Sequence, residues 1–151
     1  MYKYFRIEDE NPLFYFKTKL GYTYTVSFTL ESFGNSYFQY LSILDFSELE
    51  GRKSPKDDKI SATIIQIIDD YFNQNPETII HYVCDSTDGY HRSRSRLFSM
   101  WFKNYDRNKI NKLKIEHSNQ SLEFLYDSSL YDTDVLQEQV LEQMNIFSEH
   151  K

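Results

Sequence analysis

The densest group of reactive side chains in this sequence lies between His81 and Phe102, in the stretch HYVCDSTDGYHRSRSRLFSMWF. A strand-like apolar run leads there into a polar turn, and a helix-like run with three arginines spaced two apart follows. The first turn of a helix presents free backbone N–H groups, which bind anions. We therefore predict an anion-binding site in the strand-to-helix turn 84–96, formed by Asp85, Asp88, Gly89, Arg92, Arg94 and Arg96.

The turn itself has residue types that suit the start of a helix. The four residues before Gly89 are all good N-caps, and an acidic residue there also suits the helix dipole. Gly89 permits a positive φ or a close approach of a ligand to the backbone. Two carboxylates would repel an incoming anion, so an arginine or a metal ion has to lie between them and the ligand.

The three arginines are predicted to differ in their surroundings. On a helix from about residue 88 to 105, Arg92 and Arg96 point to solvent, whereas Arg94 projects into the apolar stripe that contains Leu97 and Phe98. A guanidinium in that position needs a partner, because it cannot lose its charge. The partner is either a turn carboxylate, in a buried pair that joins strand to helix, or the phosphate of a ligand.

Other chemistries fit the stretch less well. With one glycine and no following lysine, the turn is not a P-loop. Cys84 and His91 resemble a nucleophile and its base, but no oxyanion-binding element accompanies them. Asp85 and Asp88 provide oxygen ligands for Mg²⁺ without the further ligands of an EF-hand. We predict no catalytic residue, no metal ligand and no cofactor.

Charge is distributed unevenly along the chain. The window 91–114 holds eight Lys or Arg against one Asp, a net charge of +7, so the remaining residues carry −13 of the total of −6. Such a window indicates a cationic surface for RNA or a nucleotide, and the acidic remainder indicates a docking surface for a protein partner. A solvated helix and strand whose lysines maintain solubility would show the same composition.

Period-two alternation predicts strands over much of the chain. In YTYTVSFTL, residues 22–30, aromatic and aliphatic side chains alternate with Thr and Ser. A strand-like run at 13–19 precedes it across Leu20-Gly21, and another at 37–46 follows a Gly-Asn turn, as in an antiparallel meander. Residues 78–84 are apolar on both sides, which is typical of an interior strand. Two shorter strands are predicted at 109–116 and 121–127.

Helices are expected in three places. Pro55 is positioned to start the first, whose isoleucines recur at helical spacing until Asn75-Pro76 ends it. The second is the arginine-bearing helix. The third is an acidic helix from about Thr133, with Leu136, Val140, Met144 and Phe147 on one side. The predicted fold class is α+β, an antiparallel aromatic-rich β-sheet with about three helices packed on it.

The totals indicate one cytoplasmic domain spanning residues 1–151. The chain has 13 Tyr and 12 Phe but only 4 Gly and 3 Pro, which argues against linkers. Its single Cys84 has no internal disulfide partner, which favours a reducing cytoplasm. We expect no membrane association, because no apolar run is long enough to span a bilayer and the N-terminus lacks a signal-peptide core.

The same stretch resembles an uncharacterised family of small bacterial proteins, a domain of unknown function. That family's pattern reads C-D-x-x-D-G, four residues, then R-x-R-x-F-x-x-W-F, and it is matched here by Cys84-Asp85, Asp88-Gly89, Arg94, Arg96, Phe98 and Trp101-Phe102. The upstream run FYFKTKLGYTYTVSF is also similar to the family's N-terminal half. The resemblance implies no activity, but it includes Arg94 and Arg96 and leaves out Arg92.

These observations favour a small non-enzymatic module that binds an anionic ligand, RNA or a nucleotide phosphate, at the turn 84–96. Two alternatives remain open. One is a protein-interaction, regulatory or defence-system component with no role on nucleic acid. The other, less favoured, is a metal-dependent phosphoryl-transfer enzyme that uses Asp85 and Asp88.

Overall fold

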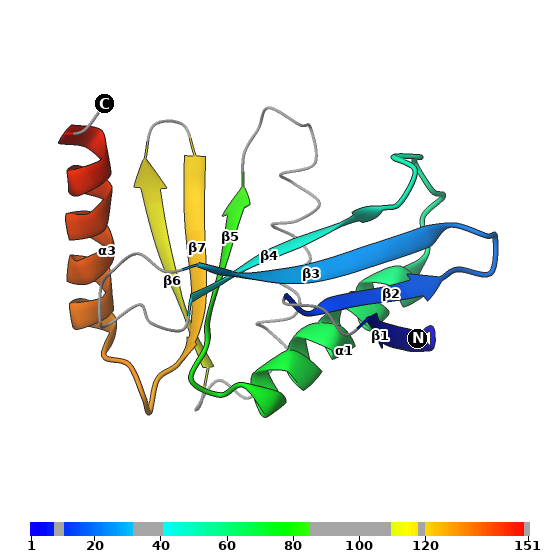
Figure 1. Cartoon of the computed structure of the whole chain (residues 1–151), viewed down its shortest axis with the longest axis horizontal. Coiled ribbons are helices and arrows are strands. Elements are labelled where there is room, and N and C mark those ends of the chain that lie inside the picture. The colour runs from blue at the N-terminus through cyan, green and yellow to red at the C-terminus, as the bar shows by residue number, and fades with distance from the viewer. Residues whose placement is uncertain (8–10, 32–40, 85–109, 118–119, 150–151) are drawn as a thin grey trace. The chain divides into compact units, whose positions relative to one another are not determined.

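The structure is a computed structural model, and it describes residues 1–7, 11–31, 41–84, 110–117 and 120–149. These residues form seven strands and two helices (Figure 1). The chain divides into two compact units. The first comprises Met1–Leu30 and Ser42–Pro76, and the second comprises Glu31–Leu41 and Glu77–Lys151.

The first unit contains four strands that lie in chain order, β1 (Tyr4–Ile7), β2 (Leu13–Lys17), β3 (Thr23–Glu31) and β4 (Leu41–Glu48). β1 pairs with β2, and β2 with β3, both antiparallel. Gly21 takes a φ of +90° in the turn between β2 and β3, as the predicted Leu20-Gly21 hairpin requires. The predicted meander is therefore present here, together with a first strand, β1, that the sequence pattern did not predict.

Aromatic rings fill the core of the first unit. Phe14, Phe16, Val26 and Phe28 are buried on one face of β2 and β3, as their alternation predicts. α1 (Asp58–Gln74) covers that face, where its Tyr71 ring stacks on Phe28 with centroids 3.8 Å apart. Packing of large rings against one amphipathic helix gives this short sheet a continuous core.

The ends of α1 follow local capping chemistry. Asp57 is the N-cap, and its carboxylate accepts a hydrogen bond from the Lys59 backbone N–H at 2.9 Å. The prediction that Pro55 starts the helix was wrong, because the carboxylate of Asp57 caps a helix whose first residue, Asp58, comes three residues after Pro55. The predicted end is confirmed: Asn75 is the C-cap, and its backbone N–H bonds the Tyr71 carbonyl.

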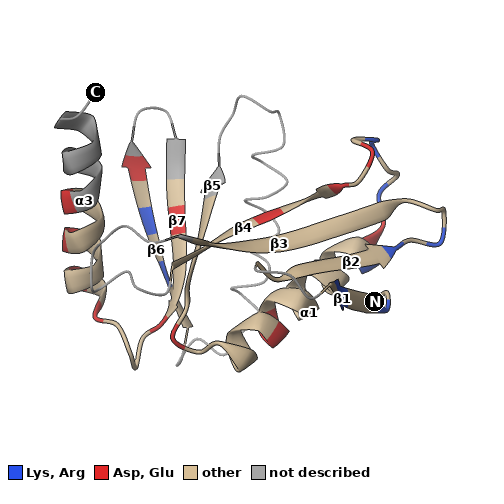
Figure 2. Cartoon of the chain, in the orientation of Figure 1, with Lys and Arg blue, Asp and Glu red and all other residues tan. Residues whose placement is uncertain are grey.

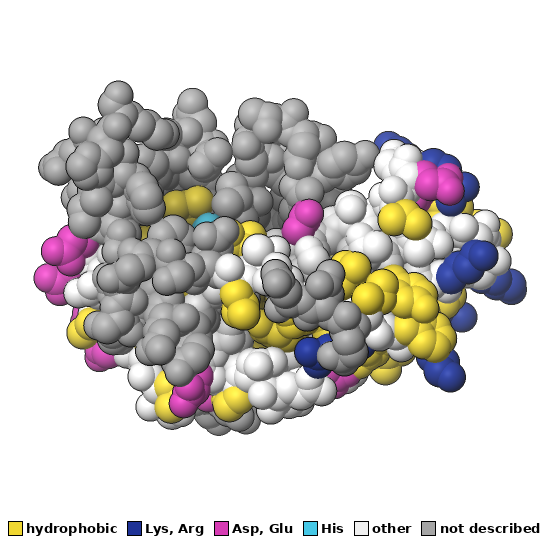
Figure 3. Space-filling view, in the orientation of Figure 1, with side chains coloured by type: hydrophobic (Ala, Val, Ile, Leu, Met, Phe, Trp, Pro, Cys, Tyr) yellow, Lys and Arg dark blue, Asp and Glu magenta, His cyan; other side chains and the backbone are white. Residues whose placement is uncertain are grey.

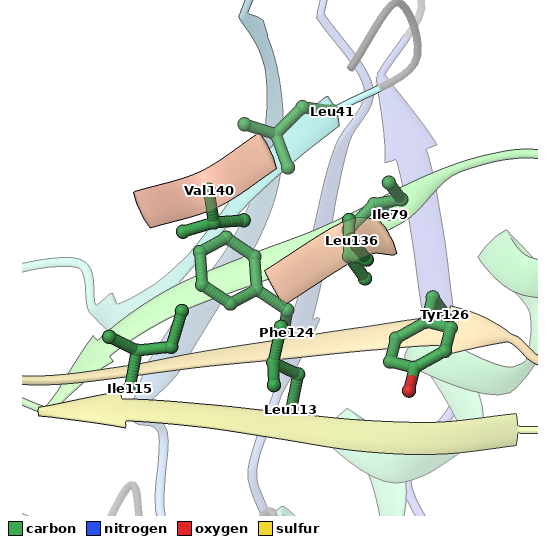
Figure 4. Packing of buried hydrophobic residues seen from close by; sticks show 8 residues of the cluster. All are labelled: Leu41, Ile79, Leu113, Ile115, Phe124, Tyr126, Leu136 and Val140. Atoms are coloured by element: carbon green, nitrogen blue, oxygen red, sulfur yellow. The ribbon is translucent and has the colours of Figure 1, made fainter. Parts of the chain in front are cut away.

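The second unit contains β5 (Ile79–Cys84), β6 (Ile110–His117), β7 (Gln120–Asp127) and α3 (Thr133–Glu149). β7 lies between the other two strands and pairs antiparallel with both. Leu41, Ile79, Leu113, Ile115, Phe124, Tyr126, Leu136 and Val140 form its main buried cluster, which joins α3 to the strands (Figure 4).

β5 is buried on both of its faces. Ile79 belongs to the cluster under α3, while Ile80 and Tyr82, which alternate with it, are fully buried on the opposite face. This confirms the prediction of an interior strand for residues 78–84. From Ile79 to Tyr82, β5 therefore exposes little surface other than that of part-buried His81.

The broad α+β class is confirmed, with antiparallel pairing between most neighbouring strands. The described residues hold two helices rather than about three, because the expected arginine-bearing helix at 88–105 falls outside them. α3 begins at the predicted Thr133, and its Leu136 and Val140 are buried as expected. Within the described ranges, no helix is both long and apolar enough to cross a membrane.

Candidate ligand-binding site

All six residues predicted to form the anion site lie outside the described residues. Asp85, Asp88, Gly89, Arg92, Arg94 and Arg96 fall in the range 85–109, as do His91 and the expected arginine-bearing helix. The structure does describe the strand that leads into this range. β5 ends at Cys84, the position at which the sequence pattern predicts the start of the turn.

The end of β5 coincides with the tip of the β6–β7 hairpin. In the strand register Cys84 is opposite Ser121, and Ser121 is opposite Glu116 on its other side. His117 and Gln120, the last pair before the hairpin connection, lie one position further out. Figure 1 shows β5 and the hairpin ending on the same side of the second unit. The chain therefore enters the predicted turn next to this hairpin.

His117 is a residue to which the sequence pattern assigned no role. The register places its backbone at the same end of the sheet as the end of β5, with β7 between them, although 33 positions of sequence separate it from Cys84. Two alternating runs separated by a short polar connection indicate the β6–β7 hairpin in the sequence. Nothing local in the sequence indicates that β7, rather than β6, pairs with β5.

The described part of the basic window lies on β6, and its two lysines stand next to carboxylates. Lys112 Nζ is 2.6 Å from the Oε1 of Glu123, a side chain with 2% exposure on β7. Lys114 Nζ is 3.8 Å from Glu116 Oε1, and both of these side chains are exposed. Figure 2 shows the cationic and acidic bands side by side on these strands. Lys112 thus serves an internal ion pair, and Lys114 is the more available cation on β6.

His81 occupies the middle of β5 and is largely buried. Its ring stacks on Phe124 with centroids 4.4 Å apart, and its Nδ1 lies 3.2 Å from the Glu123 carbonyl oxygen. Because a carbonyl only accepts hydrogen bonds, Nδ1 must carry the proton. Burial lowers the pKa of His81, and the bond to the carbonyl opposes that shift only in part. His81 is therefore a neutral packing residue rather than a cation for phosphate.

Among the residues that the structure describes, no three His, Cys, Asp or Glu side chains lie close enough together to hold a metal ion. Buried Asp127 instead organises the turn after β7, since its Oδ1 accepts hydrogen bonds from the Ser129 backbone N–H at 2.9 Å and from the Ser129 hydroxyl. Buried Glu48 does the same after β4, where it accepts the Glu50 backbone N–H and pairs with Arg52. These acids stabilise turns.

The fold defines a small α+β protein with a largely antiparallel sheet. The chain belongs to the Family of unknown function (DUF6169), whose sequence model matches residues 56–150. The match begins just before α1 and includes β5 to α3 together with the predicted turn. β1 to β4 precede it, as does the upstream run that resembled a family N-terminal half. No curated protein and no solved structure matches the chain.

Removing the ammonium of Lys112 should destabilise the fold. Lys112→Met leaves the buried Glu123 carboxylate without this cation, and we expect the free energy of unfolding to fall by about 3 kcal/mol. Lys114→Met, on the same face of β6, is the matched control and should cost less than about 0.5 kcal/mol, because Lys114 is 54% exposed. Urea denaturation measures both. Equal effects in the two variants would show that the Lys112–Glu123 pair has no special role.

The lowered pKa of His81 should make stability depend on pH. Below about pH 6.5 the unfolded chain binds a proton at this position while the folded chain resists it, so stability falls as pH falls. The contribution is at most about 1.4 kcal/mol per pH unit and vanishes above about pH 7. His81→Phe should flatten the slope of unfolding free energy against pH between about pH 7 and 5. Identical slopes in wild type and variant would contradict the assignment.

Proposed function

We propose that this protein is a small, non-enzymatic, cytoplasmic module that binds an anionic ligand, RNA or a nucleotide phosphate, at the strand-to-helix turn 84–96. Arg92 and Arg96 contact phosphate, and Arg94 orients the ligand or the turn carboxylates. The bacterial origin implied by the sequence resemblance and the single Cys84 both agree with a reducing cytoplasm. RNA is the ligand class that the test below addresses first.

The observation that carries this proposal is the net charge of +7 in residues 91–114 of a chain whose total is −6. The geometry of the second unit supports it in two ways. Ile79, Ile80 and Tyr82 of β5 are buried, and His81 between them packs as a neutral ring, so this part of the strand offers no charged group to a ligand. Lys112, on β6, pairs with a buried carboxylate, which leaves the arginines of the turn and exposed Lys114 as candidates for phosphate.

Binding of short single- and double-stranded RNA and DNA, followed by fluorescence polarisation across a salt series, tests the proposal. Wild type should bind with micromolar or tighter affinity at low salt, and binding should weaken steeply as salt rises. Arg92→Gln/Arg96→Gln should weaken binding at least tenfold. For single strands, this double variant should also have a shallower dependence of the logarithm of the binding constant on the logarithm of the salt concentration. The slope should fall by about 0.7 for each phosphate that the variant no longer neutralises. Arg94 is left intact because of its expected structural pairing.

Lys53→Gln/Lys56→Gln removes the same charge from two exposed positions outside the window, and it should leave binding unchanged. Equal weakening in both double variants would show that only net charge matters and would overturn the turn as the site. An absence of binding to every nucleic acid at low salt would remove nucleic acid as the ligand.

A second candidate function, docking of a basic protein partner, is supported by the outer face of α3. Asp134, Glu138 and Glu142 are exposed and spaced four apart on this face, opposite the buried Leu136 and Val140. Like charges at this spacing weaken an isolated helix by about 0.2–0.5 kcal/mol per pair. No Lys or Arg occurs in Thr133–Glu149 to offset them, so a basic partner surface would relieve the repulsion.

Affinity purification of the tagged chain, with and without nuclease, tests this docking surface. A stoichiometric partner that resists nuclease and is lost from Glu138→Gln/Glu142→Gln is the expected result. The exposed acids Asp45 and Glu77 provide the control, since Asp45→Asn/Glu77→Gln removes the same charge elsewhere and should retain the partner. Retention of the partner by both variants would exclude the α3 face.

A further inference from the structure

The face of β1, β2 and β3 that points away from α1 carries a second surface with ligand-binding character. Alternation puts the core residues on the α1 side, and on the other side it puts Phe5 and Ile7 from β1 and Leu13 and Tyr15 from β2. We call these four residues the aromatic face. Figure 3 shows hydrophobic side chains gathered over these strands, with lysine and arginine side chains beside them.

Two rings at the centre of the aromatic face stack on each other. Phe5 and Tyr15 are direct partners in the β1–β2 register, and their centroids are 5.3 Å apart with an interplanar angle of 28°. Phe5 remains 46% exposed and Ile7 43% exposed. A stacked pair of rings on an open strand surface is a π-platform, because a planar ligand can extend the stack on an exposed ring face.

Two lysines flank this platform. Lys3 Nζ lies 5.6 Å from the Phe5 ring centroid, and Lys17 is exposed on the same face of β2, two residues from Tyr15. Residues 1–7 and 11–30 contain four Lys or Arg and no Asp or Glu. The acids of residues 8–10 lie outside the described residues, and exposed Asp45 on β4 is on the same face, one strand beyond β3.

β3 adds hydroxyl groups to the same face. Thr25 is the register partner of Tyr15, and Thr23 and Ser27 flank it on the alternating positions. All three are partly exposed. The surface therefore combines stacking rings, cations at one end, and hydrogen-bonding hydroxyls that can both donate and accept.

We propose that the aromatic face binds single-stranded nucleic acid, with bases stacked on Phe5 and Tyr15 and phosphates held by Lys3 and Lys17. Stacking on aromatic rings combined with a cationic track is how proteins bind single strands without sequence preference. A duplex hides the faces of its bases, so this surface selects unpaired nucleotides. The inference rests on the proposed function only for the ligand class, because it uses a surface of the first unit rather than the turn 84–96.

The test compares affinities for a short single-stranded oligonucleotide and for its duplex, using the full chain. Phe5→Leu/Tyr15→Leu keeps apolar side chains on the face but removes both rings. We expect it to weaken single-strand binding roughly 5-fold or more per stacked base while leaving duplex binding and the salt dependence unchanged. Phe5→Tyr/Tyr15→Phe keeps two rings and is the matched control, which should bind as wild type does. Circular dichroism and thermal melting check that each variant folds.

Photocrosslinking of wild type to a thiouridine-containing oligonucleotide provides a second readout that needs no variant. Crosslinks should map to peptides containing Phe5 or Tyr15, and crosslinks confined to other peptides would overturn the proposal. Self-association of wild type that Phe5→Leu/Tyr15→Leu abolishes, without any loss of single-strand binding, would identify the face as an interface between copies and would equally overturn it.

The variants separate this inference from the proposed function. Loss of single-strand binding in Phe5→Leu/Tyr15→Leu but not in Arg92→Gln/Arg96→Gln would support the aromatic face and contradict the turn. The reverse pattern would support the turn and contradict the aromatic face. Weakening in both double variants would support two surfaces that act on one strand, and no binding by wild type would overturn both.

Discussion

Burial of β5 on both faces governs where the second unit can place polar chemistry. Ile79 contributes to the cluster under α3, Ile80 and Tyr82 are buried on the opposite face, and β7 pairs along one edge. A polar side chain on such a strand loses much of its hydration, and His81 accordingly packs as a neutral ring. The carboxylates and arginines of the predicted turn follow directly after Cys84, where the strand ends.

The same constraint explains how the second unit uses its charged residues. Glu123 is buried on β7, and a carboxylate in such a position requires a cation and hydrogen bonds. Lys112 pairs with this carboxylate from the neighbouring strand. The sequence pattern assigned Lys112 to a cationic surface, but in the structure it forms an internal ion pair. His81 similarly stacks on Phe124 as a neutral ring. Net charge along a sequence therefore overstates the cations available to a ligand, as Lys112 on β6 illustrates.

Features that depend on local periodicity were predictable from the sequence. The alternation around Val26 and Phe28 indicated β3, the Asn75-Pro76 pair indicated the end of α1, and helical spacing indicated α3 from Thr133. Features that depend on long-range strand pairing, or on a choice between two similar local signals, could not be predicted from the sequence. β1 is too short to show a period, and Asp57 rather than Pro55 determines the start of α1. The position of His117 at the same end of the sheet as Cys84, with β7 between them, follows only from the pairing of β5 with β7. The predicted site residues themselves, 85–96, lie outside the described residues, so their roles remain predictions.

Backbone amide NMR shifts measure whether a ligand binds at the end of β5. The isotope-labelled protein is titrated with single-stranded RNA, and the shift of each amide is followed. We expect that, within the second unit, shifts concentrate at the strand end formed by Cys84, His117 and Gln120. The opposite end of the same strands, at Ile79, Ile110 and Asp127, should stay unchanged. Shifts at that opposite end, or saturating RNA that leaves the Cys84 end unperturbed, would contradict a site at the end of β5.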